Sequence, residues 1–148
     1  MGSLMSEEVA VLATIDPDAL TAATYDSDWV DMGAFQQIMA IVMVGTLGTS
    51  ATVDASVRQA TDSSGTGAKA ITGKSITQLT QAGTDSDKQA IINVRSDELD
   101  VTGDFTHVSL RIVVAVATSD GGGIILGRRA RRQPANQSDL ASVDEIVS

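Results

Sequence analysis

The sequence has no cysteine and one histidine, and aromatic residues make up only 3% of its 148 positions. Without cysteine there is no disulfide and no thiol chemistry, a composition that fits synthesis in a reducing cytoplasm. Without a second histidine, the usual ligand sets of zinc are missing. The few aromatic rings offer little surface for stacking sugars or bases, so the core has to be built from aliphatic residues.

Basic residues are also scarce, because ten lysines and arginines stand against 19 aspartates and glutamates, for a formal net charge of −9. Such a chain is disfavoured as a general binder of nucleic acid, since phosphate contacts need a positive face. The longest apolar stretch, residues 38–44, is far shorter than a membrane span, and the N-terminus lacks the pattern of a signal peptide. We therefore expect neither nucleic acid nor a membrane as a partner.

Hydrophobic residues nevertheless make up 43% of the chain, enough for one domain with a real core. Alternation of apolar and polar residues predicts strands most clearly at residues 51–59 and 106–118. In the second strand the polar face would hold His107, Ser109 and Arg111, and the apolar face would hold Val108, Leu110, Ile112, Val114 and Val116. Residues 34–47 also predict a strand, but one that is apolar on both faces toward its end. Such a strand is either buried on both sides or lies between the core and a binding partner.

Weaker strands are expected at residues 6–14, 70–79 and 89–94. Because polar turns separate the strands and no long amphipathic helix intervenes, the pattern predicts an all-β fold, an antiparallel β-sandwich. It would be jelly-roll-like, with about seven or eight strands and extended N- and C-terminal arms. The predicted parts are an N-terminal arm with a first short strand (1–23), the sandwich domain (24–134) and a C-terminal tail (135–148).

Three turns are expected to shape this sandwich. Residues 16–18, Asp-Pro-Asp, predict a turn after the first strand. Residues 48–50 predict a hairpin that joins the two strands on either side of them. The glycine-rich residues 119–123 predict a flexible turn, which would close a terminal hairpin.

The string that looks most catalytic is AKAITGKS, residues 68–75. It satisfies a relaxed form of the phosphate-binding loop, with Lys74 and Ser75 at the positions that contact phosphate and Mg²⁺. That loop must follow a buried strand and open a helix, whereas here a polar loop precedes it and no helical pattern follows. A glycine-rich hairpin loop is therefore the better interpretation.

No other pattern predicts a chemical site. His107 has no nucleophile motif nearby and is expected to face solvent. The acidic stretch at 26–31, DSDWVD, lacks the spacing of a calcium loop. We expect no catalytic residues, no cofactor and no metal site, and therefore not an enzyme.

Four of the ten basic residues lie within five positions and are called the arginine run: Arg128, Arg129, Arg131 and Arg132. In so acidic a chain, this run can pair with the chain's own acidic loops or another subunit, bind a partner, or be solvated. Strand alternation would place Arg129 and Arg131 on one face and the other two on the opposite face. Trp29 would anchor on the core or on a partner, and it joins the arginine run as a predicted partner-binding residue.

The order and texture of several segments resemble small structural proteins of tailed bacteriophages, of the capsid decoration or cement type. The segments are YDSDWVDMGAFQQIMAIVMVGTLG, ATVDASVRQATDSS, QAIINVRSDELD and HVSLRIVVAVATSDGGGIILGRRARR, within residues 24–134. This resemblance implies a virion protein that is made in the host cytoplasm and lies on the outer capsid surface. It implies that the chain binds the major capsid protein, cements neighbouring subunits and forms a homo-oligomer.

Two other functions stay open at this point. A phage tail or head–tail joining component would have a similar sequence texture but fewer copies in a particle. A carbohydrate-binding β-sandwich would need exposed aromatic side chains, for which Trp29 is the candidate.

Overall fold

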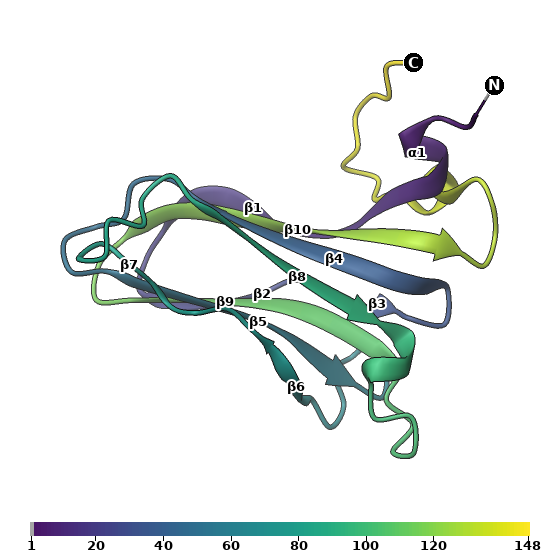
Figure 1. Ribbon diagram of the computed structural model, residues 1–148, viewed down its shortest axis with the longest axis horizontal. Coiled ribbons are helices and arrows are strands. Elements are labelled where there is room, and N and C mark those ends of the chain that lie inside the picture. The colour runs from purple at the N-terminus through teal and green to yellow at the C-terminus, as the bar shows by residue number, and fades with distance from the viewer. Residues whose placement is uncertain (1) are drawn as a thin grey trace.

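Two antiparallel sheets packed face to face form the body of the molecule in the computed structural model (Figure 1). The structure describes residues 2–148, so that Met1, the first residue of the predicted N-terminal arm, lies outside the described residues. One sheet has the strand order β1-β10-β4-β8, and the other has the order β2-β9-β5-β6, with β3 on β9 and β7 on β5. The strands are β1 (Val9–Leu20), β2 (Ala23–Asp26), β3 (Val30–Asp31), β4 (Phe35–Val44), β5 (Thr52–Ala60), β6 (Lys69–Ser75), β7 (Leu79–Thr80), β8 (Gln89–Arg95), β9 (His107–Ala115) and β10 (Ser119–Ala130).

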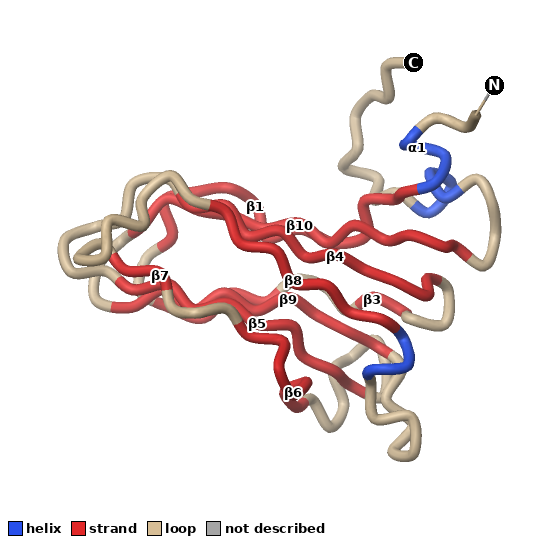
Figure 2. The backbone as a smooth tube through the Cα atoms, viewed as in Figure 1, coloured by secondary structure: helices blue, strands red, loops and turns tan. Residues whose placement is uncertain are grey.

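Helices are few and short, as Figure 2 shows. They are α1 (Met5–Glu8), η1 (Ser96–Glu98) and η2 (Ala135–Ser138). None of the helices within residues 2–148 is long and apolar enough to cross a membrane.

The strand order confirms the predicted fold class. Because β2 and β3 both pair with β9, and β6 and β7 both pair with β5, the ten strands occupy eight positions. Along the chain these positions switch sheets at every connection except that from β5 to β6. Two four-position sheets joined in this way form an antiparallel jelly roll.

Both predicted hairpins are wrong, although the strands themselves are present. Strand β4 pairs with β10 and β8, whereas β5 pairs with β9, β6 and β7 in the opposite sheet. Strands β9 and β10 likewise lie in different sheets. Alternation shows which side of a strand is buried, but a short loop can lead either to a neighbour in the same sheet or across the core.

The glycine-rich residues 119–123 are part of β10 and not a flexible turn. Gly122 pairs with Met43 of β4, so the glycines lie inside a four-stranded sheet. A Cβ on Gly123 would lie 2.5 Å from Cδ2 of Leu110 in the opposite sheet. A Cβ on Gly122 would lie 2.9 Å from the backbone of Pro17. Close approach from both sides therefore requires glycine here.

The predicted turn at residues 16–18 is also wrong. Strand β1 continues through this segment with a register shift between Ile15 and Asp18. Pro17 has no N–H to give to a ladder, and it is tolerated because β1 is an edge strand with a bulge at this point. Residues 9–20 thus form one long strand of the sandwich, where the sequence predicted only a short strand within an arm.

The core lies between the two sheets and is aliphatic, as the composition indicated. The predicted inward face of residues 106–118 is confirmed at four positions, which are 3% exposed or less: Val108, Leu110, Ile112 and Val114. The fifth, Val116, is 70% exposed because β9 ends at Ala115 and Val116 has a positive φ of 75°.

The two ends of the chain lie together at one end of the sandwich (Figure 1). The backbone N–H of Leu140 donates to the carbonyl oxygen of Val11 at 2.9 Å, and the Val11 N–H donates to Oδ1 of Asp139 at 2.7 Å. The C-terminal segment therefore docks on the free edge of β1. Beyond it the chain runs outward, and Val147 is 84% exposed.

Candidate interaction surfaces

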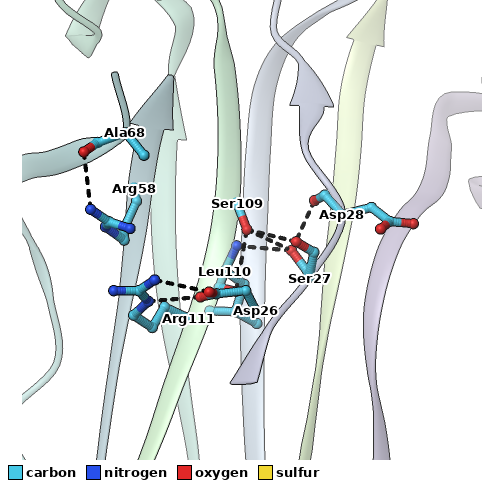
Figure 3. Close-up of polar contacts among 8 residues, drawn as sticks. All are labelled: Asp26, Ser27, Asp28, Arg58, Ala68, Ser109, Leu110 and Arg111. Carbon is cyan, nitrogen blue, oxygen red and sulfur yellow. Dashed lines mark hydrogen bonds and ion pairs between the residues drawn. The ribbon is translucent and has the colours of Figure 1, made fainter. Parts of the chain in front are cut away.

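The outer face of the sheet β2-β9-β5-β6 is polar, and its arginines are hydrogen-bonded within the chain. Arg111 on β9 donates from Nε and Nη2 to the two carboxylate oxygens of Asp26 on β2, at 2.7 and 2.9 Å (Figure 3). This fork raises the pKa of Arg111. Arg58, on β5, donates to the carbonyl oxygen of Ala68 at 3.1 Å. These charged groups are satisfied within the chain.

Two buried hydroxyls adjoin this ion pair. Ser109 faces away from the core, as alternation predicted, but the segment after β2 covers it, so that it is 2% exposed. Its Oγ donates to the carbonyl oxygen of Ser27 at 2.8 Å, and the N–H of Leu110 donates to the Ser27 Oγ at 2.9 Å (Figure 3). The pair fastens the β2–β3 connection to β9, which is a structural role.

The outer face of the other sheet, β1-β10-β4-β8, is apolar over its middle part, with the polar Gln37 and Asn93 toward one end. Ile41 on β4 lies beside Ile124 on β10 and Ile91 on β8. Because residues alternate along a strand and the neighbours of Ile41 are buried in the core, these side chains point outward. Ile91 is 57% exposed. The residues of this surface, the apolar face, are Val11, Met39, Ile41, Met43, Ile91, Ile124 and Leu126.

The apolar face is hollowed at both ends. A hollow of about 680 Å³ lies between the bulge of β1 and β4, with Pro17, Ile41 and Met43 in its wall. The backbone of the glycines at 121–123 also lines it, since these residues have no side chain to fill it. A second hollow of about 470 Å³ lies beside Met39 at the other end of the strands.

The two ends of the apolar face carry opposite charge. Asp16, Asp18 and Asp120 line the first hollow. Arg128 lines the second, although Glu8 of α1 does so as well. The sheet face is therefore an apolar strip with an acidic end and a basic end.

The arginine run lies at and beyond the end of β10, and all four side chains are exposed. The ion pairs formed within residues 2–148 include none of the four. Arg129 has a positive φ of 55°, which interrupts strand alternation, so the predicted division of the run between two faces is wrong. Partner binding by the run stays a prediction.

Trp29 is half-buried in the connection between β2 and β3. Its indole lies against Gly65 in the loop after β5, since a Cβ on that glycine would be 2.6 Å from Nε1. Gly65 also has a positive φ of 82°, a second reason for glycine there. Trp29 therefore anchors on a loop of its own chain, and a role in binding a partner stays a prediction.

Residues 69–75 of the phosphate-loop string form strand β6, so the expected glycine-rich hairpin loop is wrong, and no turn opens a helix there. Lys74 Nζ donates to the carbonyl oxygen of Asn93 at 2.8 Å and to Oε1 of Glu98 at 3.0 Å. Lys74 thus joins β6 to the edge of β8. The Nδ1 atom of His107 lies 2.8 Å from the hydroxyl of Thr106. No group of three potential metal ligands gathers anywhere in residues 2–148.

The apolar face was only partly predictable. The sequence indicated that residues 34–47 have two apolar faces, and this is what β4 shows. It did not reveal that Ile91 and Ile124 lie on either side of Ile41, because that depends on which strands become neighbours. Nor did it reveal the acidic end, where Asp16 and Asp18 of β1 lie beside Asp120 of β10.

Comparisons with known proteins add no family. No protein-family model matches the chain, and no curated protein matches it. Among solved structures, a chain from infectious bursal disease virus Gx strain is 12% identical with a TM-score of 0.48, covering 86% of this chain and 33% of that one. A chain from naturally occurring empty particles of cowpea mosaic virus is 8% identical, with a TM-score of 0.43 and 89% of each chain covered.

A third structure, TmCBM61 in complex with β-1,4-galactotriose, is 10% identical with a TM-score of 0.34, covering 73% of this chain and 66% of that one. The present chain spans about a third of the length of the infectious bursal disease virus chain. All three TM-scores are below 0.5, so nothing about the function of those proteins is transferred to this chain.

Proposed function

We propose that this chain is a non-catalytic structural protein of a virion, which binds the outer capsid surface and cements neighbouring major capsid subunits. The observation that carries the proposal is the arginine run, which is exposed and free of internal ion pairs in a chain of net charge −9. Arginine side chains in such a position fit an acidic protein surface through paired hydrogen bonds to carboxylates.

Two further features support the virion as the place of this role. Residues 24–134 resemble tailed-phage decoration proteins in segment order, and the strand order is that of a jelly roll, which capsid proteins often use. Because jelly rolls also serve other functions, the proposed function is argued mainly from the exposed surfaces and less from the fold. Nucleic acid is disfavoured as the partner of the arginine run because the chain as a whole repels phosphates.

The edges of the sheets indicate how the protein would bind. The edge of β1 is covered at Val11 by the C-terminal segment, and Lys74 binds a carbonyl on the edge of β8. Covered edges disfavour the addition of a foreign strand. Attachment through the sheet β1-β10-β4-β8 would therefore use its face and its charged ends.

The proposal is tested by co-sedimentation of the purified protein with capsids, using Arg131→Glu/Arg132→Glu. This variant should lose most particle binding while its melting temperature stays within about 2 °C of wild type, because both side chains are exposed. A control, Lys69→Glu/Lys88→Glu, has the same net charge but reverses two lysines outside the run, and it should still bind.

Three results would count against the proposal. Wild-type protein that does not sediment with capsids would overturn it, as would equal loss of binding in the control. Quantitative mass spectrometry of particles that finds only a few copies would replace cementing with tail or head–tail joining.

A further inference from the structure

The apolar face forms a contiguous apolar surface that is exposed to water in the single chain. Its seven side chains come from all four strands of one sheet, while the other sheet has a polar outer face. Contiguous apolar surface of this kind marks a contact site. We propose that a second copy of this chain covers the apolar face, with the two sheets packed face to face and antiparallel about a two-fold axis.

Charge selects a second copy as the occupant. Asp16 and Asp120 lie at one end of the apolar face, and Arg128, with the rest of the arginine run behind it, lies at the other. Glu7 and Glu8 of α1 line a hollow with Arg128 and Arg129, and Asp139 binds the backbone of Val11, so the four arginines of the run outnumber these three carboxylates. In the antiparallel pair, the two-fold axis lies between the two faces and runs across the strands. It therefore brings the acidic end of each copy to the basic end of its partner. The surface is therefore complementary to itself.

The size of the face also fits a pair of copies. Four strands by about eight residues give a footprint of roughly 500 Å² from ordinary strand dimensions. Two such footprints bury about 1,000 Å², which is the size of a weak, transient interface and less than the roughly 1,200 Å² of a stable one. We therefore expect a reversible dimer that dissociates on dilution.

This inference does not depend on the proposed virion role. If both hold, the dimer determines how the two arginine runs are arranged on the capsid surface. In the antiparallel pair, the two arginine runs lie at opposite ends of the dimer. One dimer could then contact two separate acidic surfaces at once, and such bivalency strengthens attachment without new contacts.

The first test replaces an exposed apolar residue of the face on its edge strand, β8. Ile91→Asp should raise the dimer dissociation constant by about tenfold or more in sedimentation-equilibrium experiments, because the new carboxylate would be buried without a partner. The matched control is Val101→Asp, which places the same charge at a residue that is 66% exposed in a turn away from the face. The control should dimerise like wild type.

The second test exploits the two-fold axis. Asp120→Lys and Arg128→Glu should each weaken self-association by about tenfold, because each places like charges opposite one another twice per dimer. An equimolar mixture of the two variants should recover wild-type affinity, since the mixed dimer has an opposite-charge pair at both ends. Parallel packing would instead leave each single variant close to wild-type affinity, because like charges already face each other in that arrangement, and a foreign partner would give no recovery on mixing.

Several results would overturn the inference. One is a wild-type chain that stays monomeric at several hundred micromolar, and another is a mixture that does not recover. A variant that ends at residue 141 should still dimerise. Loss of the dimer in that variant would assign the face to the partner's exposed Ile146 and Val147 instead of its sheet. If the chain is a monomer that still binds capsids, the dimer inference fails and the proposed function stands. If the chain is a dimer that does not bind capsids, the proposed function fails and the dimer inference stands.

Discussion

Gly122→Ala tests whether the glycine-rich segment is a strand buried on both sides. In a flexible turn, replacing glycine by alanine would stabilise the protein by about 0.4–1 kcal/mol, because the unfolded chain loses freedom. In the structure, a Cβ on Gly122 would lie 2.9 Å from the Ile15 carbonyl oxygen and from the Cα of Pro17. Both are backbone atoms, so the bulge of β1 has to move as a unit.

Such overpacking typically costs about 1–3 kcal/mol. After the gain from the unfolded state, Gly122→Ala should destabilise the fold by about 1–2 kcal/mol. For a domain of this length, the melting temperature should then fall by roughly 3–6 °C. The assay is urea denaturation together with a thermal scan, both followed by circular dichroism.

Two controls make the result decisive. A Cβ on Gly121 would lie 3.2 Å from the carbonyl oxygen of Met43, so Gly121→Ala should be nearly neutral. A Cβ on Gly2 would meet nothing within 4 Å, and Gly2→Ala should have no effect. If Gly122→Ala raised the melting temperature, or matched Gly121→Ala, the bulge would not lie over β10 and the reasoning would fail.

Three further predictions concern stability. Hydrogen bonds from the Arg95 backbone N–H and from Lys74 lower the pKa of Glu98 below its ordinary value of 4.5. The ionised Glu98 therefore stabilises the fold above about pH 4.5, and this stabilisation is lost as the pH falls through the lowered pKa. Glu98→Gln should therefore cost about 1 kcal/mol at pH 7 and progressively less in acid, in melts from pH 7 to pH 3; a difference that does not vary with pH would contradict this. Ser109→Ala should cost about 1–3 kcal/mol in urea denaturation, because it leaves the buried carbonyl of Ser27 without its donor; a neutral result would show that water replaces the hydroxyl. Asp139→Ala should expose the edge of β1, so that limited proteolysis removes the C-terminal segment faster than in wild type at an unchanged global melting temperature; equal cleavage rates would show that the Leu140 hydrogen bond holds the segment alone.

The sequence was informative about faces and uninformative about neighbours. Alternation in residues 106–118 identified the four core residues of β9, and the run in residues 34–47 indicated a strand with two apolar sides. Both signals are local, because a strand places successive side chains on opposite faces. Strand pairing is set by distant segments, so the two hairpins were predicted where the chain crosses between the sheets.

Glycine and proline misled the prediction for a related reason. Residues 119–123 and 16–18 have the composition of turns. In the fold they touch each other, because the bulge at Pro17 lies over Gly122, and each explains the unusual residues of the other. The arginine run was found from its density alone, but its position at one end of an apolar face depends on the packing of β10 between β1 and β4.

The docking of the C-terminal segment beside α1 has a practical consequence. Both ends of the chain emerge at the same pole of the sandwich, near the basic end of β10 (Figure 1). A fluorescent protein or peptide fused at either terminus would therefore project from that pole and leave the glycine-floored hollow at the opposite end open. Labels meant to report on the acidic end should instead be placed in the loops that join β4 to β5 or β7 to β8.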